Sequence, residues 1–191
     1  MKGETIKAAN EAIGGIAEML NLGKVGVIPT DTVYGLAAHP RHAQSVERLY
    51  SIKMRSEKKP IALLASSIAA IESFGFALNG KAKELAQRFW PGALTLIIEN
   101  SKGETEGFRI PNHDWTLRLI EKCGGVLRVT SANISGGKDA TNADEALTQI
   151  GLEADFVVDD GPSKGGIAST VAKVSHSGEI TILRQGAISI L

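Results

Sequence analysis

Short apolar runs alternate along this chain with segments whose apolar residues recur every three or four positions. The first such segment covers residues 6–20 and ends near residues 21–23, and a short apolar run follows at residues 25–28. Apolar residues at helical spacing favour amphipathic helices, whereas brief apolar runs bounded by turn formers favour buried strands. The repeated order of strand, loop and helix predicts an α/β fold.

The same reading assigns the rest of the chain. Asn79 is a candidate N-cap, and Asn142 with Glu145 fits a capping box. Helices are predicted at residues 43–50, 81–90 and 114–124 and after residue 142; strands are predicted at 61–65, 94–98, 126–129, 156–158, 170–174 and 180–183; loops are predicted at 100–107 and 161–166. Because neither a repeat nor a linker divides these elements, residues 1–191 are predicted to form one domain.

Composition excludes several classes of protein. Lysine plus arginine and aspartate plus glutamate both total 21, so no general basic field attracts nucleic acid. The single cysteine and the four histidines never fall at the spacing of metal ligands, so no metal site is predicted. No stretch approaches the roughly 20 apolar residues that cross a bilayer. We therefore expect a cytoplasmic protein that contacts no membrane.

The common nucleotide and hydrolase motifs are absent from the sequence. Each Gly-Lys pair lacks the Ser or Thr of a P-loop, and neither G-x-G-x-x-G after a strand nor G-x-S-x-G occurs. Any phosphate site must therefore rely on side chains.

A basic segment supplies such side chains. Lys53, Arg55, Lys58 and Lys59 place four cations within seven residues, between a predicted helix and a predicted strand. Loops at such positions often carry function, and this one suits a polyphosphate. The alternative is a solvated basic turn, because charge runs are common on surfaces.

Two polar clusters and two arginines are further candidates. Residues 130–137 and 165–171 combine hydroxyls, an amide and glycines, which could cradle an anion or simply form turns. Arg109 lies in an apolar setting, where its fork could clamp a carboxylate or form a structural ion pair. Arg184 is similarly ambiguous. Asp31 is interpreted as a turn or cap residue without chemistry.

Taken together, these motifs resemble the YrdC-like family of threonylcarbamoyl-AMP synthases, in the family's own order and over nearly the whole chain. The motifs are Pro29-Thr-Asp-Thr-Val-Tyr-Gly-Leu36, Lys53-x-Arg55, Lys59-Pro60, Pro91-Gly92-x-Leu-Thr95, Phe108-Arg-Ile-Pro111, Thr130-Ser-Ala-Asn133, Ser169-Thr-Val171 and Leu183-Arg184-x-Gly186. The end at Leu191 predicts the short, single-domain form.

The resemblance implies a twisted, mixed, open α/β sheet with helices around a deep basic cavity. It implies an enzyme, a nucleotidyltransferase, that forms threonylcarbamoyl-adenylate and pyrophosphate from L-threonine, bicarbonate and ATP with Mg²⁺, for modification of tRNA. By motif position, Lys53 and Arg55 are the catalytic residues. The implied ATP-binding residues are Lys53, Arg55, Lys59, Thr105, Ser131, Asn133 and Arg184; the implied threonine-binding residues are Thr32, Arg109, Val129 and Ser169. Leu64 stands where the family commonly has histidine.

Because no residue stands out as a nucleophile or general base, we expect catalysis by positioning and charge stabilisation, with threonine carbamate attacking the α-phosphorus of ATP. Partner proteins of tRNA modification and a weak RNA contact are further expectations. One alternative is a divergent RNA-binding or translation-associated protein without this activity. Another is a carbamoyl-adenylate domain like that of hydrogenase-maturation carbamoyltransferases, which occur as longer chains with zinc-finger regions.

Overall fold

The computed structural model describes residues 4–54, 60–151 and 153–190. The helices are α1 (Ala12–Asn21), α2 (Ala43–Ile52), α3 (Ile68–Ser73), α4 (Gly80–Phe89), α5 (Asp114–Lys122) and α6 (Ala143–Ala146), which continues into a π-helical turn, Leu147–Gly151. The strands are β1 (Glu4–Lys7), β2 (Gly26–Ile28), β3 (Gly35–Ala38), β4 (Leu63–Ala65), β5 (Leu94–Glu99), β6 (Thr105–Arg109), β7 (Val126–Ser131), β8 (Phe156–Asp159), β9 (Thr170–Val174) and β10 (Ile180–Arg184).

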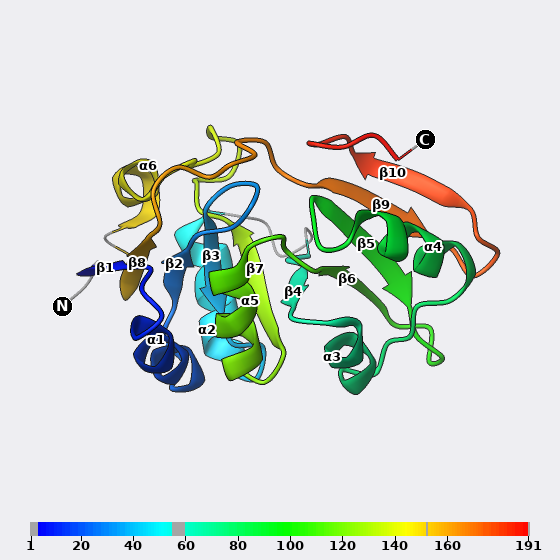
Figure 1. The fold of residues 1–191 in the computed structure, drawn as a ribbon, viewed down its shortest axis with the longest axis horizontal. Coiled ribbons are helices and arrows are strands. Elements are labelled where there is room, and N and C mark those ends of the chain that lie inside the picture. The colour runs from blue at the N-terminus through cyan, green and yellow to red at the C-terminus, as the bar shows by residue number, and fades with distance from the viewer. Residues whose placement is uncertain (1–3, 55–59, 152, 191) are drawn as a thin grey trace.

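These strands form one sheet in the order β1-β8-β2-β3-β7-β4-β6-β5-β9-β10. Its pairs are mixed: β2 runs parallel to β8, whereas β3 runs antiparallel to both β2 and β7. The sheet twists along the whole length of the molecule and stays open at β1 and β10 (Figure 1). The predicted twisted, mixed α/β sheet is confirmed, whereas the deep basic cavity stays a prediction.

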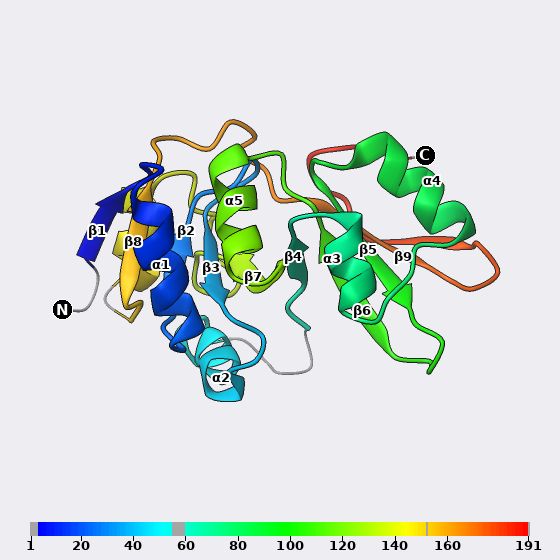
Figure 2. The ribbon, with the colours of Figure 1, turned by 60° about the horizontal axis from the view of Figure 1, so that its bottom comes forward.

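Among the first five strands of this order, β8, β2 and β3 are covered on both faces, whereas the edge strand β1 is largely exposed. Successive residues of a strand point to opposite faces, and β8 shows this clearly. Phe156 and Val158 pack in a cluster with α1 and α5, whereas Val157 packs in a second cluster with α2 and α6. Figure 2 shows α1 and α5 side by side over this part of the sheet. Burial on both faces explains why β2 and β3 contain no exposed residue.

The other strands have a core of their own. α3 and α4 pack with β4, β5, β6 and β9 around Phe108, which is fully buried beside Phe76 with ring centroids 5.1 Å apart. Such aromatic pairs add to the free energy of burial. The sheet thus has two packed halves, and β4 and β7 are the neighbouring strands where the halves meet.

Several sequence predictions differ from the structure. Residues 4–7 form a strand instead of the start of a helix, because Ile6 pairs with Val158 of β8 at the sheet edge. The predicted loop at 100–107 contains the start of β6, which forms a hairpin with β5. β3 and α3 were not predicted. In β3, Gly35 leaves room for Val129 of β7, whose Cγ1 lies 2.5 Å from the place of a Cβ at residue 35.

A long connection between β8 and β9 joins the two halves along the end of the sheet (Figure 1). We call residues 160–168 the strap. Its Gly165 N–H donates to the Asp31 carbonyl (2.9 Å), and its Gly166 N–H donates to the Thr32 carbonyl (2.8 Å). The strap therefore fixes the backbone of the loop that follows β2.

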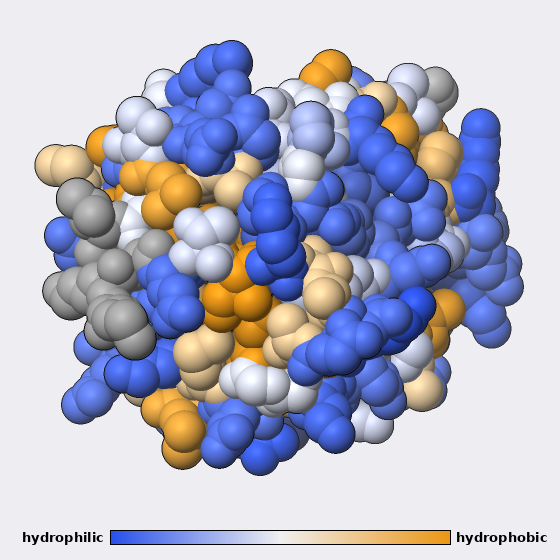
Figure 3. Space-filling view, turned by 60° about the vertical axis from the view of Figure 1, so that its left-hand side comes forward, coloured by the Kyte–Doolittle hydropathy of each residue, from blue (hydrophilic) through white to orange (hydrophobic). Residues whose placement is uncertain are grey.

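The outer surface is mixed in character. On the face nearest to β1, hydrophilic residues form most of the surface and apolar residues gather near the centre (Figure 3). In the part of the chain that the structure describes, no helix combines the length and the apolar character that crossing a bilayer requires.

We predict that Gly165→Ala lowers the free energy of unfolding by about 1–3 kcal/mol, the usual cost of forcing atoms into a packed contact. The added Cβ would lie 2.8 Å from the Asp31 carbonyl oxygen and 3.3 Å from Thr32 Cα, both of them backbone atoms. Urea unfolding measures the change. Gly14→Ala is the control, because nothing lies within 4 Å of its Cβ. In helix α1 this change should raise stability by up to about 1 kcal/mol, and equal effects at the two positions would contradict the prediction.

Candidate functional site

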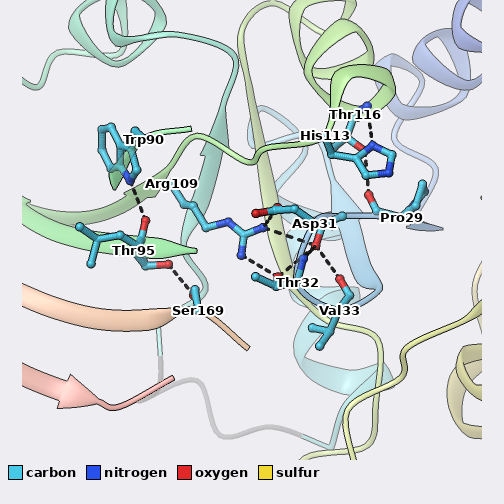
Figure 4. A network of polar contacts seen from close by, with 12 residues as sticks. Pro29, Asp31, Thr32, Val33, Trp90, Thr95, Arg109, His113, Thr116 and Ser169 are labelled. Atoms are coloured by element: carbon cyan, nitrogen blue, oxygen red, sulfur yellow. Dashed lines mark hydrogen bonds and ion pairs between the residues drawn. The ribbon is translucent and has the colours of Figure 1, made fainter. Parts of the chain in front are cut away.

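A tight turn after β2 provides the first part of the site. The Thr30 hydroxyl donates to the Val33 carbonyl (2.7 Å) and accepts from the Thr32 N–H (3.2 Å). Thr30 and Thr32 are 4% and 3% exposed. Hydroxyl groups that bond to their own backbone stabilise such turns. The turn therefore holds the Asp31 and Thr32 side chains in a defined direction, towards β6 (Figure 4).

Arg109, the last residue of β6, meets this turn from the other half of the sheet. Its Nη1 donates to Thr32 Oγ1 (2.7 Å), and its Nη2 donates to Asp31 Oδ1 (2.5 Å) and weakly to Thr30 Oγ1 (3.4 Å). The residue is 5% exposed. Among the described residues, nothing accepts a hydrogen bond from its buried Nε. The structure thus shows Arg109 in an ion pair, with one donor still available.

The charge of Arg109 is held in a demanding environment. Burial lowers the pKa of its guanidinium, the Asp31 carboxylate opposes this, and the positive charge of Arg184 lowers the pKa further. A guanidinium remains protonated even so. Arg109 and Arg184 are therefore close enough to repel each other, and an anion between them would relieve the repulsion.

Arg184 and Ser169 form the second part of the site. Arg184, at the end of β10, donates to the Ser169 carbonyl from Nε (3.1 Å) and from Nη2 (2.9 Å). The Ser169 hydroxyl lies 2.8 Å from Thr95 Oγ1 of β5, and Ser169 is 5% exposed. Figure 4 places this hydroxyl pair beside Arg109, on the side away from the Thr32 turn.

Lys53 forms the third part, at the C-terminal end of α2. It is only 1% exposed. Its ammonium donates to the carbonyls of Ser131 (2.5 Å) and Asn133 (2.6 Å) and to Asn133 Oδ1 (2.9 Å). The Ser131 hydroxyl also donates to Asn133 Oδ1 (2.6 Å). Lys53 therefore fixes the loop after β7, and the structure brings together three of the predicted ATP-binding residues.

Met54 follows Lys53 with a left-handed backbone, at a φ of 51°, and is 79% exposed. That conformation costs a residue with a side chain roughly 1–2 kcal/mol. The predicted residues Arg55 and Lys59 come next in the chain and lie outside the described residues.

Two strands bring further predicted residues to the same region. Leu64 of β4 is the strand partner of Arg109, so both side chains point to one face of the sheet. Leu64 is 6% exposed and packs in the apolar cluster under α1 and α5. Val129 of β7 donates its N–H to the Ala62 carbonyl (3.0 Å). Leu64 thus places an apolar side chain beside Arg109.

Thr105 is the predicted residue that the structure does not bring to these clusters. It is exposed and begins β6, four residues before Arg109. At about 3.3 Å per residue, the two Cα atoms lie about 13 Å apart. The threonine-site and ATP-site predictions as a whole remain predictions.

Asp31 was interpreted from the sequence as a turn or cap residue without chemistry, whereas the structure pairs it with Arg109. A single aspartate between two threonines has the composition of an ordinary turn, and only the register of β6 shows that Arg109 ends opposite it. Thr30 and Thr95 were also given no role from the sequence, since neither side chain carries a charge. The pairing of Asp31 with Arg109 shows that the ion-pair alternative for this arginine is realised in the structure.

Fold and site together define an α/β protein in which arginines from separate strands converge on a hydroxyl-rich turn. A family model described as "Telomere recombination" (Sua5, YciO, YrdC) matches residues 18–186. The chain belongs to this Sua5/YciO/YrdC family, so the predicted resemblance is confirmed.

Named relatives agree with this family. A threonylcarbamoyl-AMP synthase of Bacillus subtilis is 33% identical over 183 residues, which cover 91% of this chain and 53% of the relative. A putative threonylcarbamoyl-AMP synthase of Methanocaldococcus jannaschii is 34% identical over 181 residues, covering 91% and 84%. This chain thus spans about half the length of the first relative and most of the second.

Solved structures give the same fold. The crystal structure of P. abyssi Sua5 complexed with L-threonine has a TM-score of 0.87 at 29% identity, covering 96% of this chain and 57% of that one. E. coli YciO has a TM-score of 0.84 at 21% identity, covering 96% and 94%. The likeness to YciO concerns the fold alone.

We predict that Arg109→Lys lowers the free energy of unfolding by about 1–3 kcal/mol, because a lysine ammonium cannot satisfy Asp31 and both threonine hydroxyls from the same position. Urea unfolding measures this loss. Arg48→Lys is the matched control: Arg48 pairs with Asp155 at 2.7 Å but its side chain is 37% exposed. Exposed pairs contribute about 1 kcal/mol or less. An Arg109→Lys variant as stable as wild type would show that this network holds nothing together.

Proposed function

We propose that this chain is a threonylcarbamoyl-AMP synthase, an enzyme that forms threonylcarbamoyl-adenylate and pyrophosphate from L-threonine, bicarbonate and ATP. The observation that carries the proposal is the buried Arg109 fork, which bonds to the Thr32 turn and keeps an Nε with no acceptor among the described residues. Family membership and the names of the relatives support the same reaction. They favour it over the RNA-binding alternative.

The amino acid would bind at Arg109. A guanidinium with a free N–H matches a carboxylate, for which two-point contact adds both energy and direction. Thr32 and Ser169 would offer hydroxyls, and the Val129 backbone would line the same place. The P. abyssi relative has been solved with L-threonine, which supports this ligand. Leu64 would give the pocket an apolar wall next to the arginine.

The nucleotide would bind on the other side, towards Lys53. We propose that Lys53, Arg55 and Lys59 hold the phosphates, with Ser131, Asn133 and Arg184 around them. The Lys53 ammonium, which already lies within hydrogen-bond distance of four oxygens of Ser131 and Asn133, would exchange one of them for a phosphate oxygen by a small movement. Thr105 is the first residue of β6, at the end of the strand away from Arg109. It would contact the nucleotide only if the hairpin of β5 and β6 turned inward.

Mg²⁺ would enter with ATP. Among the described residues, no group of three or more histidines, cysteines or carboxylates lies close enough together to hold a metal ion. Mg²⁺ is commonly bound through phosphate oxygens and waters with few protein ligands. The phosphates of ATP are therefore its natural ligands in this site.

The chemistry follows from placement. Threonine's amine and bicarbonate give a carbamate and water, and a carbamate oxygen then attacks the α-phosphorus while pyrophosphate leaves. Holding the two substrates in line can supply roughly 7–11 kcal/mol of the barrier. The cations around Lys53 and Arg184 would offset charge on the departing pyrophosphate. We find no need for a protein nucleophile.

The setting of the enzyme belongs to the same proposal. We propose one YrdC-like unit over residues 1–191 that works in the cytoplasm and passes its adenylate to partner proteins that modify tRNA. Any RNA contact would be weak, since the formal net charge is zero and no general basic field attracts nucleic acid. These partners follow from the reaction, because an adenylate must be transferred to an acceptor.

The first test is release of pyrophosphate. We expect the protein to release it from ATP with Mg²⁺ only when both L-threonine and bicarbonate are present. Serine, valine and 2-aminobutyrate serve as controls for the pocket beside Leu64. Release that is indifferent to the amino acid, or none despite ATP binding, would count against the proposal.

A second test removes the cations. Lys53→Ala and Arg55→Ala should each lower turnover about 100-fold or more, as is common when a group that stabilises developing charge is lost. Because Lys53 also holds the Ser131 and Asn133 carbonyls, its variant should unfold more readily as well. Lys173→Ala, at an exposed position of β9, is the control. Near-normal turnover in both cation variants would remove them from the nucleotide site.

A further inference from the structure

Asp31 and Arg109 pair with each other, and each side chain also has a polar atom that could bind a ligand. Arg109 Nη2 donates to Asp31 Oδ1, and within the described chain no other hydrogen bond reaches the Asp31 carboxylate. Arg109 Nε is buried without an acceptor. The Asp31 side chain is 12% exposed, and the Arg109 side chain is 5% exposed. One carboxylate oxygen and one guanidinium N–H are therefore unused at the same place.

Burial restricts what can bind there. A charge that loses its partner in a buried site is strongly destabilised, because water no longer solvates it. A simple carboxylate that took Arg109 from Asp31 would leave the aspartate unpaired. A ligand that carries a carboxylate and an ammonium on one carbon would instead pair with both residues.

Hydrogen bonds hold the backbone of Asp31 in place, so only its side chain can move. The Asp31 carbonyl accepts from Gly165 N–H, and the Thr32 carbonyl accepts from Gly166 N–H, so the strap holds the turn on both sides of the peptide. The Thr30 hydroxyl fixes the turn from within. Any exchange of partners is therefore confined to rotation of the Asp31 side chain.

We propose that Asp31 binds the α-ammonium group of the amino-acid substrate while Arg109 binds its carboxylate. On binding, the two side chains exchange their mutual ion pair for contacts with the zwitterion, and every charge stays paired. Asp31 is then a specificity residue that selects α-amino acids over carboxylates without an amine. This inference rests on the proposed function and adds a residue that the sequence motifs did not assign.

The selection has a chemical use. Only a ligand with an amine can form a carbamate, so a site that rewards the ammonium excludes carboxylates that would occupy Arg109 without reacting. Carbamate formation joins the nitrogen to the bicarbonate carbon, releases one water and passes one ammonium proton to solvent, so the nitrogen is no longer cationic. The Asp31 carboxylate then returns to Arg109 when the amino-acid carboxylate leaves. The ion pair seen in the structure is the arrangement to which the side chains would return.

Calorimetry with two ligands tests the proposal. L-threonine and 3-hydroxybutyrate share a carbon skeleton and differ by the amine. We expect the wild-type protein to bind threonine roughly 10- to 100-fold more tightly, the range of a charge-assisted hydrogen bond. In Asp31→Asn this preference should fall to within a few-fold, with threonine weakened and 3-hydroxybutyrate unchanged or tighter.

Two further variants complete the design. Asp160→Asn is the control, because Asp160 pairs with His113 (3.1 Å) in the strap and makes no bond to Arg109. It should keep the wild-type preference. Asp31→Glu, which keeps the charge, should restore most of it and also serves if Asp31→Asn is unstable. An unchanged preference in Asp31→Asn, or none in Asp31→Glu, would overturn the role of Asp31 alone. A wild-type protein that binds neither ligand would overturn the proposed function and this inference with it.

Discussion

Burial of the Arg109 guanidinium is the constraint on which the site depends. Its charge can be held at 5% exposure only because the opposite half of the sheet presents Asp31 and two threonine hydroxyls to it. The contact crosses from β6 to the turn after β2, and the strap locks that turn in place. The contact between Arg109 and the turn therefore joins the two packed halves of the sheet. It also holds the guanidinium where a carboxylate could bind.

On the other side of the site, Lys53 is likewise a buried cation whose hydrogen bonds join two elements of the fold. Its ammonium is covered by oxygens from the loop after β7, so the end of α2 and the end of a central strand are fixed to each other. β7 lies between β3 and β4, next to the junction of the halves. β4 alone separates β7 from β6, so the proposed phosphate and amino-acid positions are carried by the same central part of the sheet, as a reaction between the two ligands requires.

The sequence was sufficient for the class of fold and for most of the residues that converge. Apolar periodicity located α2, α4, α5 and most strands, and Asn142 accepts from Glu145 N–H as the predicted cap. Periodicity failed where a signal was ambiguous. Ile6 fits helical spacing yet pairs with β8, and the glycine and alanines of β3 have little strand preference until both faces are buried. Asp31 was named but assigned no chemistry, because its pairing with Arg109 depends on contacts between segments that lie far apart in the sequence.

The contacts that build the site are separated widely along the chain. Lys53 and Ser131 are 78 positions apart, as are Asp31 and Arg109, and Arg184 joins only through the final hairpin. Contacts of such long range form late, because loop closure must precede them. Ser169 and Arg184 follow β8 in the chain, so the polar contacts of the site are completed only after β9 and β10 have been synthesised.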